Sequence, residues 1–153
     1  MNITIISVGT KSKHEISMLI DSYVKRLPKH VKLSWRFLKH GSTDDPVSSL
    51  SIESENILRA INPSDKVILL DETGRQLTSI QLSGEVFDTS NTNSDIVFII
   101  GGAYGVNQAV KSRSNITLAL GKLVYPHQIV RLVLAEQIYR AYTISIGHPY
   151  HHL

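Results

Sequence analysis

The sequence predicts an α/β fold in which a mainly parallel sheet carries helices on both faces, as a single domain over residues 1–153. Two observations lead to this fold class. Short apolar, β-branched runs alternate with segments whose apolar residues recur at helical spacing. The length fits one domain of ordinary size, and 42% hydrophobic with 19% charged residues is typical of a folded soluble protein.

The first half of the chain contains two strand patterns and two helix patterns. "NITIISV" is a β-branched run that ends at Gly9 and indicates a buried strand. "SKHEISMLIDSYVKRL" repeats apolar residues at helical spacing until Pro28 ends the pattern. "VKLSWRFL" alternates as a second strand. "GSTDDPVSSLSIESENILRAI" predicts an exposed loop and then a helix that Asp45 caps and Pro46 begins.

The second half predicts three more strands and three more helices. "KVILLD" is a strand, and "DETGRQ" is a polar turn at its carboxyl end, where ligands bind in open α/β sheets. A weaker helix covers about 79–87 and leads to "SDIVFIIGG", the most continuous apolar strand. "GVNQAVKSR" indicates a short helix, and "NITLAL" a fifth strand. The last helix begins at Pro126 and is apolar nearly all round, which predicts burial against the sheet and against another subunit.

Composition excludes several classes of function. With no cysteine, the chain has no disulfide, thiolate zinc site or cysteine nucleophile. No apolar run approaches the roughly 20 residues that span a bilayer, so no membrane association is expected. The start "MNITIISVGTKSKH" does not resemble a signal peptide, and we expect a cytoplasmic protein. The net charge of +3 and pI of about 9.2 favour a polyanionic partner only weakly.

Two loops are candidate ligand-binding segments. In "FIIGGAYGV" a buried strand leads directly into Gly101 and Gly102, where the backbone can approach a ligand closely. The alternative is a tight turn without a ligand, and the spacing is not that of the dinucleotide fingerprint. In "LGKLVYPHQIVR" an irregular loop with Gly121 could wrap a small ligand with backbone groups. His127, at the start of the next helix, is either a catalytic group or a capping or packing residue.

The last helix carries charges in an apolar context. Glu136 and Arg140 stand four residues apart, a spacing that favours a structural ion pair. Charges on an otherwise buried helix need partners or a wet cavity. Arg131 and Arg140 are therefore also candidates for contacting phosphate or an anionic transition state.

The chain ends in "HPYHHL", a tail rich in histidine. No acidic residue or cysteine accompanies these histidines, so we predict no metal site. Gly147 allows a turn, Pro149 stiffens the backbone and Tyr150 offers a ring to pack. These three residues predict an ordered tail.

"IGGAYGV", "YPHQIVRLVLAEQIYRA" and the terminal "HPYHH", in that order, resemble the RlmH family of ribosomal RNA large subunit methyltransferases. "ITIISVGTKSK" and "LLDETGRQL" are also similar, so the resemblance covers essentially the whole chain. It implies a SPOUT-type fold with a C-terminal trefoil knot, working as a homodimer. It further implies S-adenosylmethionine as the cofactor and, as the substrate, a pseudouridine of 23S rRNA methylated at N3 in the assembled ribosome.

The resemblance also assigns the cofactor site. Family members usually carry Ser and Thr in the knot loop, in a pattern like L-S-x-M-T-x-P-H, where this chain has Gly121 and Val124. Their tails commonly end in Lys or Arg, where this chain has His152 and Leu153. By position, the implied cofactor-binding residues are Leu70, Gly101, Leu120, Gly121, Lys122, Leu123, Val124 and Tyr125.

A mechanism follows from this implied chemistry. The N3 proton of pseudouridine must leave before or during methyl transfer, and a histidine is a suitable base at neutral pH. We expect the tail to fold over the cofactor, of its own or of a partner subunit, with His151 or His152 as the base and Tyr150 packing on the nucleobase or cofactor. Arg131 and Arg140 would position RNA or stabilise the anion.

Two other functions remain open. The altered knot loop is compatible with a non-catalytic RNA-binding or ribosome-binding module of the same fold. An enzyme that uses another nucleotide-like ligand is disfavoured, because the sequence has no P-loop and no acidic metal cluster.

Overall fold

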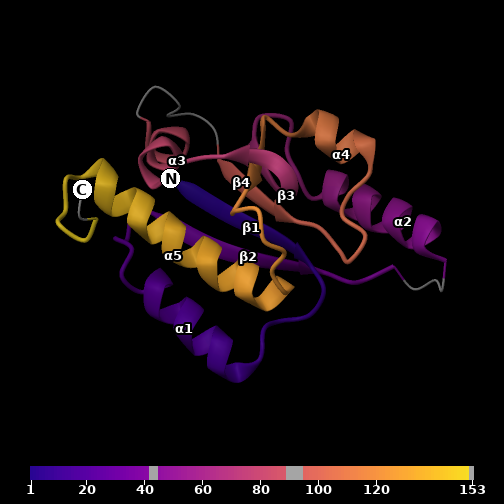
Figure 1. Cartoon of the computed structure of the whole chain (residues 1–153), viewed down its shortest axis with the longest axis horizontal. Coiled ribbons are helices and arrows are strands. Elements are labelled where there is room, and N and C mark those ends of the chain that lie inside the picture. The colour runs from indigo at the N-terminus through magenta and orange to yellow at the C-terminus, as the bar shows by residue number, and fades with distance from the viewer. Residues whose placement is uncertain (42–44, 89–94, 152–153) are drawn as a thin grey trace.

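The computed structural model describes residues 1–41, 45–88 and 95–151. Within them, five parallel strands form one sheet of order β2-β1-β4-β3-β5 (Figure 1). This confirms the predicted α/β fold with a parallel sheet. The strands are β1 (Asn2–Val8), β2 (Lys32–Leu38), β3 (Lys66–Gln76), β4 (Ile96–Ile100) and β5 (Ile116–Ala119); the helices are α1 (His14–Val24), α2 (Pro46–Arg59), α3 (Ser79–Phe87), α4 (Gln108–Arg113) and α5 (His127–Ser145).

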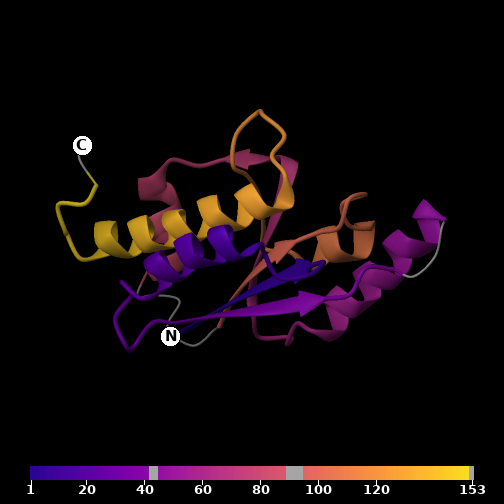
Figure 2. The same cartoon turned by 90° about the horizontal axis from the view of Figure 1, so that it is seen from below.

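Helices cover both faces of the sheet, as predicted. Alternate residues of the central strands point to opposite faces: Phe98 packs with residues of α3 and α5, and Ile99 packs with residues of α2 and α4. Figures 1 and 2 show α1 and α5 running side by side over one face, with α2 at the other. Two apolar cores therefore flank the sheet, which explains why its central strand β4 is apolar at every position.

Helix α5 is buried largely by its own subunit. It lies on the sheet between α1 and α3 and buries Leu134, Ala135, Ile138 and Ala141. The contact with another subunit stays a prediction, as does the trefoil knot. In the described part of the chain, no helix combines the length and apolarity needed to cross a membrane.

The prediction that "DETGRQ" forms a turn ending the third strand was wrong. The strand β3 continues to Gln76, and Leu118 of β5 pairs with both Leu70 and Arg75, so the segment between them bulges out of the ladder. Asp71 stabilises the bulge by accepting two hydrogen bonds from Thr73, at 2.9 Å to the backbone nitrogen and 2.6 Å to the hydroxyl. The polar residues are therefore a bulge within a strand, and pairing resumes beyond them.

Candidate functional site

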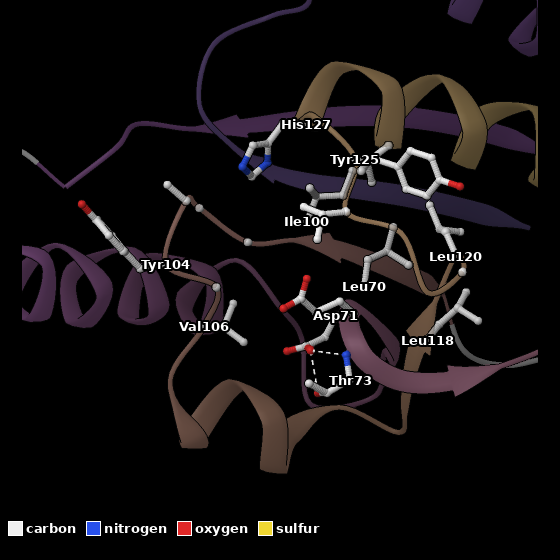
Figure 3. Close-up of a pocket in the computed structure, with 18 of the residues that line it drawn as sticks. Leu70, Asp71, Thr73, Ile100, Tyr104, Val106, Leu118, Leu120, Tyr125 and His127 are labelled. Atoms are coloured by element: carbon white, nitrogen blue, oxygen red, sulfur yellow. Dashed lines mark hydrogen bonds between the residues drawn. The ribbon is translucent and has the colours of Figure 1, made fainter.

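A pocket of about 510 Å³ lies beyond the ends of β4 and β5, beside the bulge in β3 (Figure 3). Carboxyl ends of parallel strands meet at one edge of a sheet, so the segments that follow these strands come together there. Figure 3 shows Leu70, Leu118 and Leu120 gathered on one side of the pocket and Tyr104 on the other. Of the predicted cofactor-binding residues, Lys122 is not in the lining; those that line the pocket are Leu70, Gly101, Leu120, Gly121, Leu123, Val124 and Tyr125.

The glycine loop after β4 is a tight turn and a pocket wall at once. Gly105 has a positive φ of 75° and donates its N–H to the carbonyl of Gly102 at 3.0 Å. A Cβ on Gly101 would lie 2.9 Å from the carbonyl oxygen of Gly105. The two alternatives for this motif, a ligand-binding loop and a tight turn, are thus compatible, because the turn itself brings backbone groups to the pocket surface.

Glu53, on α2, supports this loop from behind and was not predicted as a site residue. It is only 4% exposed; one carboxylate oxygen accepts from the backbone N–H of Gly41 at 2.9 Å and lies 3.4 Å from Nδ1 of His40. The other oxygen has no hydrogen-bond partner among the described residues and lies against Gly102, where an added Cβ would be 2.1 Å away. The available signal was helical spacing, since Glu53 stands four residues before the buried Ile57.

Asp71 gives the pocket an ionised carboxylate. Burial acts to raise its pKa, but hydrogen bonds from Thr73 and the ion pair with Lys111, at 3.1 Å, outweigh burial and hold the pKa below its usual 3.8. Asp71 is therefore an anion at neutral pH. Glu72 and Lys111 also line this edge, so it carries two carboxylates and one ammonium group, an excess of acidic groups that favours a cationic ligand.

His127 lines the same pocket at the start of α5 (Figure 3). Its pKa is lowered from 6.5, first by burial and then by the positive charges of Arg131 and His40. The imidazole is therefore neutral at pH 7. It can accept or donate a hydrogen bond at the pocket without adding a positive charge.

Arg131 is enclosed by the fold. The side chain is 3% exposed, and its guanidinium donates to the Ser7 hydroxyl at 3.0 Å, the Thr10 carbonyl at 2.6 Å and the Val8 carbonyl at 3.3 Å. It also stacks over the ring of Phe37, 5.0 Å from the centroid. Arg131 thus ties α5 to the segment after β1. Its expected contact with RNA stays a prediction, and its enclosure does not favour that contact.

The C-terminal tail folds back on the last two turns of α5, which agrees with the predicted ordered tail. The Tyr150 hydroxyl donates to Glu136 at 3.2 Å, and Arg140 pairs with the same carboxylate while its guanidinium lies 4.8 Å from the centre of the Tyr150 ring. The ring also meets Tyr139 edge on, at 4.9 Å. Burial and the Glu136 carboxylate raise the pKa of Tyr150 to about 12. Gly147 supplies the turn with a φ of 65°.

The tail and the pocket lie at opposite ends of α5. The helix has 19 residues, about 28 Å at 1.5 Å per residue; it begins at the pocket with His127, and the carboxyl terminus of the chain lies at its other end (Figure 1). His151 lies with the tail, and its buried Nδ1 has no hydrogen-bond partner among the described residues, whereas His152 lies outside them. Arg140 therefore joins Tyr150 and His151 in one cluster, but one chain does not bring this cluster to its own pocket.

No group of three or more His, Cys, Asp or Glu side chains in the described ranges is placed to hold a metal ion.

Comparison with known proteins identifies relatives along the whole chain. Residues 1–151 match the model of a family described as predicted SPOUT methyltransferase. The chain is 38% identical over 154 residues to ribosomal RNA large subunit methyltransferase H of Laribacter hongkongensis, and 42% identical over 158 residues to the protein of the same name from Clostridium botulinum strain Alaska E43. The Chromobacterium violaceum protein of that name is 36% identical over 154 residues. Each alignment covers 99% of both chains.

Proposed function

The chain belongs to the SPOUT methyltransferase family, and from this membership we propose that it transfers a methyl group from S-adenosylmethionine to N3 of a pseudouridine in 23S rRNA. The substrate is the assembled ribosome in the cytoplasm. The names of its relatives, which are ribosomal RNA large subunit methyltransferases, support the class of substrate. The resemblance of the tail and the glycine loop to RlmH proteins supports the nucleotide and the atom.

The pocket beyond the ends of β4 and β5, beside the bulge in β3, is the observation that carries the proposal. Its volume of about 510 Å³ is suited to a nucleoside-sized cofactor. Leu70, Ile100 and Leu118 offer apolar walls for an adenine ring, and the glycine loop offers backbone groups for its polar edges. The anionic Asp71 suits a ligand that carries a sulfonium and an ammonium group. When bound, S-adenosylmethionine supplies an electrophilic methyl group.

The tail cluster provides the remaining chemistry. A tail histidine, His151 or His152, accepts the N3 proton, since imidazole is a base of suitable strength at neutral pH. Arg140 stays protonated because its hydrogen bond with Glu136 raises its pKa, and this cation stabilises the developing imide anion. Tyr150 stays a neutral hydroxyl at pH 7, because its pKa is about 12, and packs on the substrate base or cofactor.

In this proposal the pocket of one subunit and the tail cluster of the other meet at the interface between subunits. Tyr150 lies beside Glu136, nine residues or about 13 Å along α5 from His127, and none of the described tail residues lines the pocket of its own chain. We therefore propose a homodimer in which the tail of one subunit completes the pocket of the other. Holding the nucleophile in line with the methyl group is the main requirement of such a displacement, and a shared site supplies this geometry only in the assembled dimer.

The second candidate function is a ribosome-binding module without catalysis. It is favoured by one observation: the knot loop has Gly121 and Val124 where the family pattern has hydroxyl groups, and Val124 is 81% exposed. Calorimetric titration with S-adenosylmethionine separates the two functions. We expect saturable binding to the wild-type protein and none to Gly101→Val, whose side chain would fill the turn. A folded wild-type dimer that binds no cofactor would support the module.

A further inference from the structure

Basic side chains are concentrated where α1 leads into β2. Residues 22–43 contain six Lys or Arg and no Asp or Glu, although the whole chain has 16 basic and 13 acidic residues. At the junction itself the basic residues are exposed to solvent. We name this surface the basic corner and define it by Lys25, Arg26, Lys29 and Lys32.

Within the described residues, the fold does not neutralise these four charges with acidic side chains. None of the four residues forms an ion pair with an acidic residue in the described part of the chain, whereas Lys66, Lys111 and Arg140 are all paired. The neighbouring acids offer little neutralisation: Asp21 is a single exposed carboxylate one turn before Lys25, and Glu136 is engaged by Arg140 and Tyr150. The basic corner therefore keeps an uncompensated positive field.

The basic corner is continuous with the C-terminal tail. The guanidinium of Arg26 lies 5.4 Å from the centre of the Tyr23 ring and 5.8 Å from that of Tyr139, and Tyr139 in turn meets the ring of Tyr150 at 4.9 Å. Figures 1 and 2 both show the α1–β2 connection at the same end of the molecule as the carboxyl terminus. A bound molecule that reaches the tail therefore passes over or beside the basic corner.

We propose that the basic corner binds the phosphate backbone of ribosomal RNA and delivers the target nucleotide to the adjoining tail. This inference rests on the proposed function for the identity of the RNA. Flexible lysines with free ammonium groups suit phosphates, which recur along an RNA strand with one negative charge each. Contacts of this kind position RNA without reading its sequence, so specificity comes from the tail and the pocket.

The test compares two variants of equal net charge. Lys25→Ala/Lys29→Ala and Arg59→Glu each lower the formal charge from +3 to +1. Arg59 is exposed on α2, away from the basic corner, and within the described residues it forms an ion pair with Glu55. Binding to 70S ribosomes that lack the modification, and to a naked 23S rRNA fragment, is measured over a series of salt concentrations. S-adenosylmethionine affinity is measured alongside by calorimetry.

We expect the double variant to reduce the steepness of log K against log salt by about 1.4 to 1.8, because each of its two lost phosphate contacts removes roughly 0.7 to 0.9. Arg59→Glu should leave the slope near the wild-type value, and cofactor affinity should be unchanged in both. An unchanged slope in the double variant, or an equal change of slope in both variants, would overturn the inference. A loss of affinity for ribosomes but not for naked RNA would indicate that the basic corner contacts a ribosomal protein, and it would also overturn the inference. Since binding is the readout, a wild-type protein that binds through the basic corner but transfers no methyl group would refute only the proposed function.

Discussion

Tyr150 donates its hydroxyl to the carboxylate of Glu136 at 3.2 Å, and this hydrogen bond fastens the C-terminal tail to α5. Arg140 shares the same carboxylate. The ion pair between Glu136 and Arg140, which helical spacing predicted, therefore also helps to hold the tail against α5. His151 follows Tyr150 directly, so this cluster also positions His151.

Removal of the tail side chains should abolish catalysis without unfolding the protein. Replacing Tyr150 and His151 with alanine should lower methyl transfer about 100-fold or more, the usual contribution of a general base. Dimerisation, measured by light scattering, should be intact, because the core does not include these residues. His14→Ala, an exposed histidine on α1, serves as the control. Wild-type activity in the double variant would refute a role for the tail.

Gly102 should tolerate no side chain. Gly102→Ala places a methyl group 2.1 Å from a Glu53 oxygen, and we expect a loss of about 1 to 3 kcal/mol in the free energy of unfolding, with weaker cofactor binding. Gly84→Ala is the matched control, because nothing lies within 4 Å of its added Cβ inside α3. That change should stabilise the protein by about 0.5 to 1 kcal/mol. Urea unfolding measures both, and equal effects would contradict the role given to Glu53.

Replacement of Arg131 should lower the stability of the protein, and this effect comes before any effect on RNA binding. Arg131→Met removes the hydrogen bonds to the segment after β1, and we expect a loss of roughly 2 to 4 kcal/mol in the free energy of unfolding. The exposed Arg59→Ala should change it by less than about 0.5 kcal/mol. A variant at Arg131 with unchanged stability and weakened ribosome binding would instead support the original prediction of an RNA contact.

His127 should make the protein acid-sensitive. Its pKa in the folded state is below 6.5, so between that lower value and 6.5 the unfolded chain binds more protons than the native one. Acidification below pH 6.5 therefore lowers the free energy of unfolding, and above pH 6.5 this group contributes nothing. His127→Gln should lose less stability than the wild type between pH 7 and pH 5.5. NMR titration of His127 with a midpoint at or above 6.5 would contradict this account.

Local pattern was enough to predict the elements of this fold. Apolar runs and helical spacing located each strand and helix, and Asp45 indeed caps α2 with a hydrogen bond to the N–H of Ser48 at 2.8 Å. The "DETGRQ" prediction failed because polarity alone does not distinguish a turn from a bulge. Only the neighbouring strand β5, with Leu118 paired to both Leu70 and Arg75, shows that the ladder continues.

The site was predictable where it depends on strand ends, and less so where it depends on tertiary contacts. The resemblance named Leu70 and Gly101 as cofactor-binding residues. Both line the same pocket, because β3 and β4 are neighbouring strands. Sequence could not show that the partners of Arg131 lie more than a hundred residues away, at the end of β1. The carboxylate of Glu53 was missed for the same reason, because its contacts come from other elements.

Transfer of labelled methyl from S-adenosylmethionine to ribosomes lacking the modification, with the labelled nucleotide located by mass spectrometry, tests the central claim most directly. The account predicts label on N3 of one pseudouridine in 23S rRNA, transferred by the wild-type dimer and not by the variant that lacks the Tyr150 and His151 side chains. Absence of transfer by a folded, cofactor-binding dimer, or label on a different class of atom, would contradict it.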